Sequence, residues 1–293
     1  MSVADRNLAQ VLRDLVSLSK PRLSLLVVLT AVTGMWMAPG ALGLVRGAAV
    51  LFFTAVVVGA ANALNSFLER DLDGLMHRTR NRPLPAHRLA PVTALYLAAV
   101  ACVTALPALW VLANPLTALL ALLALVTYVL VYTPLKRASS WALPVGAVPG
   151  AMPPLMGWTA VTGEVDPAGL TLFALLFVWQ LPHFTAISIY LKEDYARADL
   201  KVFARVHGDK RARLAIIGFS LLLLPTSLSI WLVGAANALY AAAAVGLSFS
   251  LFAWGLTGLQ PADSTRWAKG FFLGTIGYLT LLLLALAVGV VRP

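Results

Sequence analysis

The feature that most constrains this chain is a series of long apolar stretches separated by short polar segments. Crossing the hydrocarbon core of a bilayer takes about 20 apolar residues per helix. Nine stretches of about that length lie near 22–39, 45–67, 91–112, 115–134, 141–161, 168–190, 212–233, 236–257 and 268–290. A chain that is 60% hydrophobic and only 12% charged cannot cover itself with polar side chains in water. We therefore predict an all-α integral membrane protein with nine transmembrane helices.

The positions of lysine and arginine predict how these helices are oriented. With nine spans, 20 of the 22 basic residues fall on the side of the N-terminus, and only Arg46 and Arg292 fall on the other. Loops that stay in the cytoplasm retain positive charge, so we expect a cytoplasmic N-terminus and an outside C-terminus. The same bias explains the net charge of +10. Because the membrane orientation already explains this positive charge, a nucleic-acid partner is not needed to explain it, and we expect no nucleic-acid binding.

One apolar stretch is less regular than the others. The stretch 141–161 contains four prolines, at positions 144, 149, 153 and 154. Proline has no backbone N–H and disrupts the hydrogen bonding of a helix interior. We therefore expect this helix to be broken and to lean on neighbouring helices or on a cavity.

The segment 62–89 concentrates charge between two apolar stretches, with three carboxylates and five arginines. Asn65, Glu69 and Asp73 recur every four residues, so on a continuous helix their side chains share one face. Oxygen ligands of this kind suit Mg²⁺. Arginines nearby suit an anion. Together these residues predict Mg²⁺ bound jointly with a phosphorylated substrate.

The loop 191–211 repeats this mixture, with Glu193, Asp194 and Asp199 among lysines and arginines. It follows the sixth apolar stretch and the loop 68–90 follows the second, so both loops face the same side of the membrane. Two acidic clusters facing each other across a helical bundle can hold Mg²⁺ ions that bridge a diphosphate. The alternative is that a loop next to the membrane carries mixed charge for solvation and topology, and for the second loop the two interpretations are equally favoured.

Polar residues at the ends of other stretches also have two interpretations. Lys20 and Arg22 at the first stretch, and Lys136 and Arg137 after the fourth, are either ordinary cytoplasmic anchors or a basic ring around the anion site. His183 lies inside the sixth stretch, where a histidine is costly unless it meets a partner or a cavity. It is either a ligand or a hydrogen-bonded structural residue.

Several motifs resemble a known family. They are KPRLSLLVVLTAVTG, NSFLERDLDGLMHRTRNRPLP, YTPLKR, GAMPPLMGWTAVTG, and WQLPHF followed by KEDY, in this order along nearly the whole chain. They are similar to the motifs of the UbiA-type intramembrane prenyltransferases. The RTRNRP segment at 78–83 is most similar to the branch of that family that transfers farnesyl to haem.

This resemblance implies a single transmembrane prenyltransferase domain over 1–293, a UbiA-like bundle of nine helices whose loops 68–90 and 191–211 cap the active site. It implies a Mg²⁺-dependent transfer of farnesyl from farnesyl diphosphate to a vinyl group of haem B (protohaem IX), which gives haem O. The catalytic and metal-binding residues it implies are Asn65, Glu69, Asp73 and Asp194. The substrate-binding candidates are Lys20, Arg22, Arg78, Arg80, Arg82, Lys136, Arg137, His183, Lys192 and Tyr195.

The resemblance also implies a location and partners. The location is the inner (plasma) membrane, with several spans and an active site that faces the cytoplasm. The partners are farnesyl diphosphate, haem B, the lipid bilayer, and a downstream haem A synthase or terminal-oxidase assembly.

The sequence departs from the family pattern in places. Glu69 stands where the family usually has aspartate, and DLKVFARVHG follows DYARA in place of a segment with glycine and proline. A UbiA-type enzyme that acts on another acceptor, such as a quinone precursor, is the first alternative, and RTRNRP and WQLPHF argue against it. A transporter is the second. It would place ionisable residues near the bilayer midplane, whereas the lysine, arginine and acidic residues assigned above fall in loops or at the ends of spans.

Overall fold

The computed structural model describes residues 7–291, and this part of the chain is helical, with no β-strand. In chain order the elements are α1 (Leu8–Leu18), α2 (Pro21–Met37), α3 (Leu44–Leu68), α4 (Arg70–Leu75), α5 (Pro91–Leu112), α6 (Pro115–Val126), the π-helix η2 (Thr127–Tyr132), α7 (Thr133–Ala138), α8 (Ala142–Thr162), α9 (Pro167–Tyr190), α10 (Lys192–Arg197), α11 (Phe203–Leu232), α12 (Ala238–Leu256), the 3₁₀-helix η3 (Thr257–Leu259) and α13 (Ser264–Gly289). The all-α prediction is confirmed.

The long helices begin where the sequence supplies start signals. Proline, whose fixed φ suits the first turn and whose missing N–H costs nothing there, begins α2, α5, α6 and α9. Side-chain oxygens of Asn114, Asp166, Asn237 and Asp263 accept the free backbone N–H groups at the starts of α6, α9, α12 and α13. Prolines and polar capping side chains therefore separate the apolar sequence into individual helices.

Seven helical segments within residues 7–291 are long and apolar enough to cross a membrane: α3, α5, 115–138, α9, α11, 238–259 and α13. The pair α1 and α2, bent by 46° where they join, makes up to eight. The protein is thus a multi-pass membrane protein. The stretch 141–161 is helical as α8 but lies outside this count, so the number nine stays a prediction. Arg6 and Arg292, both counted in assigning the orientation, lie outside the described residues.

The expectation of a broken helix over 141–161 is wrong, because α8 runs without interruption from Ala142 to Thr162. Most of it is buried against α2, α6 and α9. The approach to α2 is so close that a Cβ added at Gly157 would lie 2.0 Å from the carbonyl oxygen of Ala31. Gln180 Nε2 donates to Ala147 O at 3.1 Å and Asn114 Nδ2 to Thr159 O at 2.6 Å. The expected reliance on neighbours is confirmed, and it explains why the prolines do not break the helix.

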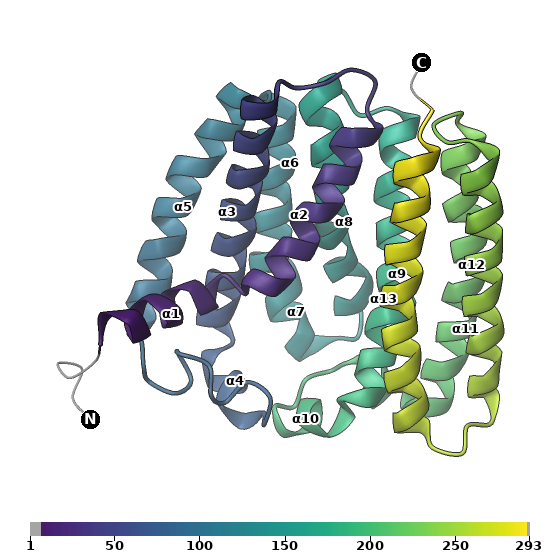
Figure 1. Cartoon of the computed structure of the whole chain (residues 1–293). Helices are drawn as coiled ribbons and strands as arrows, with labels where there is room; N and C mark the ends of the chain where they lie inside the picture. Colours follow the sequence, from purple (N-terminus) through teal and green to yellow (C-terminus); the bar gives the residue numbers. More distant parts are fainter. Residues whose placement is uncertain (1–6, 292–293) are drawn as a thin grey trace.

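The two largest of the four apolar clusters in the described part of the chain form the cores of the bundle. One lies mainly among α3, α5, α6 and α8, and the other among α9, α11, α12 and α13. Figure 1 shows the short helices α4 and α10 together at one end of the bundle, near α1, whereas the C-terminal end of α13 lies at the opposite end. The polar loops therefore gather at a single end, where the candidate site lies.

Candidate active site

The predicted row of polar side chains lies where α3 ends and α4 begins. Glu69 is the residue between the two helices, with φ −96° and ψ 3°. The helical pattern of hydrogen bonds nevertheless continues across it, because Glu69 N donates to Asn65 O at 2.9 Å and Asp73 N donates to Glu69 O at 2.7 Å. All three side chains are buried, with exposed fractions of 2% for Asn65, 6% for Glu69 and 1% for Asp73. The four-residue spacing thus produces a buried row of oxygen atoms at the polar end of the bundle.

Each side chain of this row accepts a hydrogen bond from a cation that comes from another part of the chain. Lys20 Nζ donates to Asn65 Oδ1, Lys136 Nζ to Glu69 Oε1 and Arg82 Nη1 to Asp73 Oδ2, each at 2.7 Å. Asn65 is held from its other side, since its Nδ2 donates to Thr133 Oγ1 at 3.1 Å. Three half-buried cations therefore meet two buried carboxylates in one cluster, which leaves an excess of positive charge for an anion.

The electrostatics of the cluster follow from this burial. Burial alone would raise the pKa of the Glu69 carboxyl, but Lys136, Lys20 and the Asn65 amide together hold that pKa below its ordinary value. Burial lowers the pKa of Lys20 to about 7, and the nearby charge of Arg82 adds to this effect. Two cations that repel each other at close range favour the arrival of a negatively charged group.

Lys136 and Thr133 reach the cluster through an irregularity of the fourth predicted span. Between α6 and α7 the chain forms the π-helix η2, a rare conformation that is frequent at functional sites. Thr133 Oγ1 donates to Tyr128 O at 2.8 Å within this segment. The Lys136 ammonium lies 5.3 Å from the centre of the Tyr132 ring, within the range of a cation–π contact. No local signal other than the YTPLKR motif pointed to Thr133.

The residues present fit a hard divalent cation. Asn65, Glu69 and Asp73 offer one amide and two carboxylate oxygens, the donor types that Mg²⁺ prefers. Within residues 7–291, no group of three His, Cys, Asp or Glu residues is close enough together to hold a metal ion, so these two carboxylates depend on the amide for a third donor. The oxygens now face lysine and arginine side chains on flexible stems, which can turn toward a bound anion.

Asp194 lies on the opposite loop, where it binds the first loop directly. Its Oδ1 accepts from the backbone N–H of His77 at 3.0 Å, and its Oδ2 accepts from the backbone N–H of Arg78 at 3.2 Å. Arg197 contacts the His77 ring. A small apolar cluster, Met76 with Ala198, Leu200 and the half-buried Tyr195, packs beside these bonds. The two long loops therefore contact each other directly. This is the arrangement expected if their acidic clusters face each other.

The remaining basic candidates are spread around this end of the bundle. Arg78 and Arg80 are exposed on the first loop, and Arg22 is exposed on α2. Arg137 Nη2 donates to Leu68 O at 3.1 Å, which fixes α7 to the end of α3. Lys192 Nζ donates to Asp209 Oδ1 at 2.7 Å. Among the basic candidates, the structure brings only Lys20, Arg82 and Lys136 into contact with the Asn65–Asp73 row.

His183 lies apart from this cluster, between α9 and α13. Its Nδ1 is 2.7 Å from Thr275 Oγ1, and its ring stacks on Trp179 with centroids 4.5 Å apart. The Thr275 hydroxyl is also 2.6 Å from the carbonyl oxygen of Phe272, and only a hydrogen bond makes so short an approach favourable. Because that hydroxyl has a single proton, the neutral ring that fits both contacts is the tautomer in which Nδ1 donates to Thr275. The Nε2 atom of His183 therefore carries the free lone pair.

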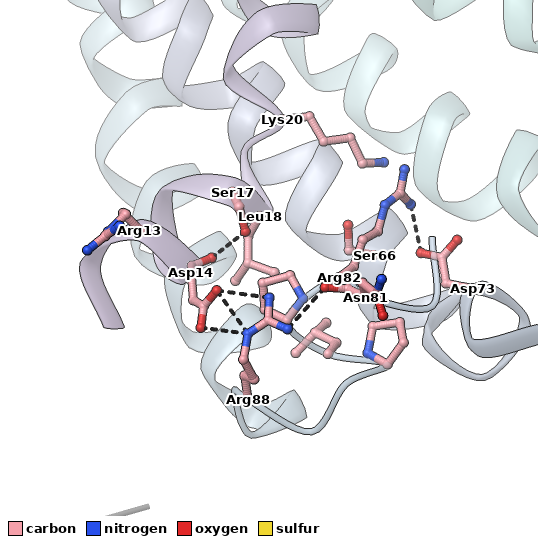
Figure 2. A pocket seen from close by; sticks show the side chains of 13 residues that line it. Arg13, Asp14, Ser17, Leu18, Lys20, Ser66, Asp73, Asn81, Arg82 and Arg88 are labelled. Carbon is pink, nitrogen blue, oxygen red and sulfur yellow. Dashed lines mark hydrogen bonds and ion pairs between the residues drawn. The ribbon is translucent and has the colours of Figure 1, made fainter. Parts of the chain in front are cut away.

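A cavity of about 360 Å³ opens beside the row, between α1 and the first loop. Its lining includes Lys20, Asp73 and Arg82 from the cluster and also Asp14 and Arg88. Figure 2 shows Arg82 reaching across to Asp73 and Arg88 turned toward Asp14. The motifs did not single out Asp14 or Arg88, because neither lies in a periodic pattern and they are 74 residues apart.

The chain matches the UbiA prenyltransferase family over residues 27–289. The match covers the row on α3 and α4 together with Arg82, Lys136 and both long loops. This chain belongs to the UbiA prenyltransferase family. The resemblance of the motifs to this family is thus confirmed. The protein is therefore a prenyltransferase.

Similar proteins from bacteria carry a more specific name. A protoheme IX farnesyltransferase of Anaeromyxobacter dehalogenans (strain 2CP-C) is 57% identical over 275 residues, which cover 94% of this chain and 93% of that protein. A protoheme IX farnesyltransferase of Myxococcus xanthus (strain DK1622) is 47% identical over 287 residues, which cover 98% of each chain. The similarity is therefore continuous from one end of the chain to the other.

Solved structures share the fold of this UbiA-family chain. A structure of digeranylgeranylglyceryl phosphate synthase has a TM-score of 0.80 at 14% identity, covering 95% of this chain and 98% of that one. A UbiA homologue from Archaeoglobus fulgidus bound to DMAPP and Mg²⁺ has a TM-score of 0.66 at 17% identity, covering 94% and 99%. At these identities the likeness establishes the architecture alone.

Proposed function

We propose that this protein transfers a farnesyl group from farnesyl diphosphate to a vinyl group of haem B, giving haem O, in a Mg²⁺-dependent reaction. The observation that carries the proposal is the buried cluster of Lys20, Arg82 and Lys136 on the Asn65–Asp73 row. It is an anion site with oxygen donors for a hard cation, in a chain that is 57% identical to a protoheme IX farnesyltransferase. The A. fulgidus homologue bound to DMAPP and Mg²⁺ supports the same pairing of metal and prenyl diphosphate.

The diphosphate side of the reaction belongs to this cluster. Asn65, Glu69 and Asp73 would form the first Mg²⁺ site, and Asp194 on the second loop, with Lys192 beside it, would belong to a second. When bound, Mg²⁺ would neutralise diphosphate oxygens and so improve the leaving group. Arg82 and Lys136 would turn from their carboxylates to the remaining phosphate oxygens, helped by Lys20. The carbon–oxygen bond to the diphosphate would then break, with its electron pair leaving on the diphosphate, and the allylic carbon would bond to the outer carbon of the haem vinyl group. A water molecule would add its oxygen to the inner vinyl carbon and lose a proton, which gives the hydroxyl-bearing side chain of haem O.

The remaining basic candidates have a supporting part in this proposal. Arg78 and Arg80 on the first loop, Arg137 on α7, Lys192 and Tyr195 on the second loop, and Arg22 on α2 surround the cluster. Exposed cations here would attract the charged diphosphate and then guide it inward. We expect their individual contributions to be smaller than those of the three half-buried cations Lys20, Arg82 and Lys136, because water screens exposed charges more strongly.

The haem side is assigned to the apolar interior between the helices. His183 would contact haem B there, since its tautomer leaves Nε2 with a lone pair that suits iron. Trp179 and Phe272, whose ring centroids lie 4.5 and 4.7 Å from that of His183, supply flat apolar surface. Excluding water from this region would protect the reactive allylic group.

The proposal extends to the placement of the protein in the cell. We propose nine spans within one transmembrane domain over 1–293, counting α8, with the N-terminus in the cytoplasm and the C-terminus outside. Loops 68–90 and 191–211 would cap the active site on the cytoplasmic face of the inner (plasma) membrane. Haem O leaving this site would pass to a haem A synthase or to terminal-oxidase assembly.

The test is a reaction with purified protein in detergent, supplied with haem B, farnesyl diphosphate and Mg²⁺. We expect farnesylated haem, detected by mass, and its loss when a chelator removes Mg²⁺. A parallel reaction supplies 4-hydroxybenzoate in place of haem B. Prenylated hydroxybenzoate without farnesylated haem would refute the haem acceptor but keep the enzyme class, and no prenylated product from either acceptor would refute the proposal as a whole.

A further inference from the structure

Helix α1 buries a carboxylate at the polar end of the bundle. Asp14 has an exposed fraction of only 4%, whereas Leu8, Leu12 and Val16 on the same helix are more than half exposed. A carboxylate is costly to bury unless it is paired and hydrogen-bonded. We therefore look outside α1 for the partners that stabilise the buried Asp14 carboxylate.

Those contacts run to the end of the first loop. Arg88 Nε lies 3.2 Å from Asp14 Oδ1 and 3.0 Å from Oδ2, and Nη2 donates to Oδ1 at 3.1 Å. Gln10 Nε2 adds a bond to Oδ1 at 3.4 Å. The remaining arm of the guanidinium, Nη1, donates to the backbone carbonyl of Asn81 at 3.0 Å. Arg88 thus joins the carboxylate of α1 to the peptide group that precedes Arg82.

Arg82 is the cation of this turn that faces Asp73, at 2.7 Å. Its side chain is 29% exposed, so burial alone does not fix its direction. Lys20 follows α1 directly and has a left-handed backbone conformation with φ 49°, an uncommon conformation for lysine. Helix α1 is therefore linked to two of the cations that line the cavity, to Lys20 through the chain and to Arg82 through Arg88.

We propose that Asp14 is a positioning residue for Arg82, acting through Arg88 and the Asn81 carbonyl, and that it sets the affinity of the site for the prenyl diphosphate. The inference rests on the proposed function, in which Arg82 binds a phosphate oxygen. A fixed carboxylate holds the planar fork of Arg88 in one orientation, because two of its nitrogens contact the same carboxylate. The fork in turn fixes the carbonyl, and so the start of the Arg82 side chain.

A purely structural role for Asp14 would give a different result. If the ion pair only held α1 against the loop, its loss would lower thermal stability and weaken the binding of every ligand together. A positioning role acts selectively, because Arg82 lies on the diphosphate side and His183 on the proposed haem side. The two roles therefore separate when the affinities for two ligands are measured on the same variants.

The experiment compares Asp14→Asn, Asp14→Glu and Arg88→Lys with wild type in detergent. The probes are farnesyl thiodiphosphate, an unreactive analogue, and haem B, each titrated to a dissociation constant, and thermal unfolding is followed alongside. We expect D14N to bind the analogue about tenfold more weakly, with haem affinity unchanged, and D14E to recover most of the loss. R88K keeps a positive charge for Asp14 but loses the fork to Asn81, so its affinity for the analogue should fall as well.

The matched control is Asp71→Asn, which makes the same chemical change on α4 at a side chain that is 80% exposed. We expect its affinity for the analogue to equal that of wild type. If D14N fails to fold, R88K carries the test alone. The inference is overturned if folded D14N and R88K bind the analogue as wild type does, or if their affinities for both ligands fall in parallel with stability. If wild type itself does not bind the analogue, the proposed function fails and takes the inference with it.

Discussion

Replacing Lys136 with methionine should destabilise the protein far more than replacing Lys136 and Glu69 together. The ammonium lies 2.7 Å from Glu69 Oε1, and the two side chains are only 17% and 8% exposed. The pKa of Glu69 is held below its ordinary value largely by this lysine, so the carboxyl stays ionised at neutral pH. Lys136→Met therefore leaves a charge buried without its partner, a change that typically costs about 3–5 kcal/mol.

The lower end of that range applies, because Asn65 and Lys20 remain near Glu69 and some water reaches the pair. A loss of about 3 kcal/mol corresponds to a decrease of roughly 6–12 °C in Tm for a chain of this size. The double variant Glu69→Gln with Lys136→Met removes both charges, and replacing both members of a buried pair is often nearly neutral. We expect its Tm to lie within about 3 °C of wild type on the same scale.

The assay is thermal unfolding in one detergent, followed by intrinsic fluorescence, for K136M, E69Q and the double variant. Arg137→Met serves as the matched control, since it removes a basic side chain from the same helix at an exposed position. It loses one hydrogen bond, to Leu68 O, which is worth about 1 kcal/mol, and leaves no buried charge without a partner. A Tm of K136M equal to that of R137M would refute the argument. So would a double variant whose loss equals the sum of the two single losses, because that result would show no coupling between the side chains.

Other predictions follow from the same cluster and its surroundings. Asp73→Asn should abolish Mg²⁺-dependent turnover while the protein stays folded in detergent, and near-normal turnover would remove Asp73 from the metal site. Asp194→Ala removes both bonds to the first loop, so proteolysis within 70–90 should accelerate and turnover should fall about tenfold or more; an unchanged cleavage pattern would contradict this. His183→Ala should weaken haem B binding and change the visible spectrum of the bound haem without changing the affinity for farnesyl thiodiphosphate, and an unchanged spectrum would argue against iron contact. Because the folded-state pKa of Glu69 is depressed below 4.5, its stabilisation is fully present above that pH and is lost as pH falls through the lower folded value. The Tm of wild type should therefore drop on acidification below about 4.5 more than that of E69Q.

Much of the architecture could be predicted from local pattern. The apolar stretches correspond to helices because segments without polar side chains must satisfy their backbone groups internally, and the prolines and caps that divide them are local signals. The row of Asn65, Glu69 and Asp73 followed from spacing alone, since a helix repeats nearly every four residues. It stayed aligned even though α3 ends at Leu68, because the backbone bonds continue through Glu69.

The helix α8 shows where local reasoning is insufficient. Its prolines predicted a break and a reliance on neighbouring helices, but the sequence did not show that those helices would enclose it closely enough to keep it unbroken. Propensity is a property of a segment, whereas burial against three helices is a property of the whole bundle. The packing therefore outweighed the local preference.

The sequence by itself determined that this is a membrane-spanning helical chain with oxygen and cationic groups gathered at one end. Only the tertiary structure decided which cation meets which oxygen: Lys20 with Asn65, Arg82 with Asp73, Lys136 with Glu69, and Arg88 with Asp14. The composition of a loop sets the number of its charges, whereas which charged groups pair depends on their distance and burial. Those are known only once segments far apart in the chain have packed together.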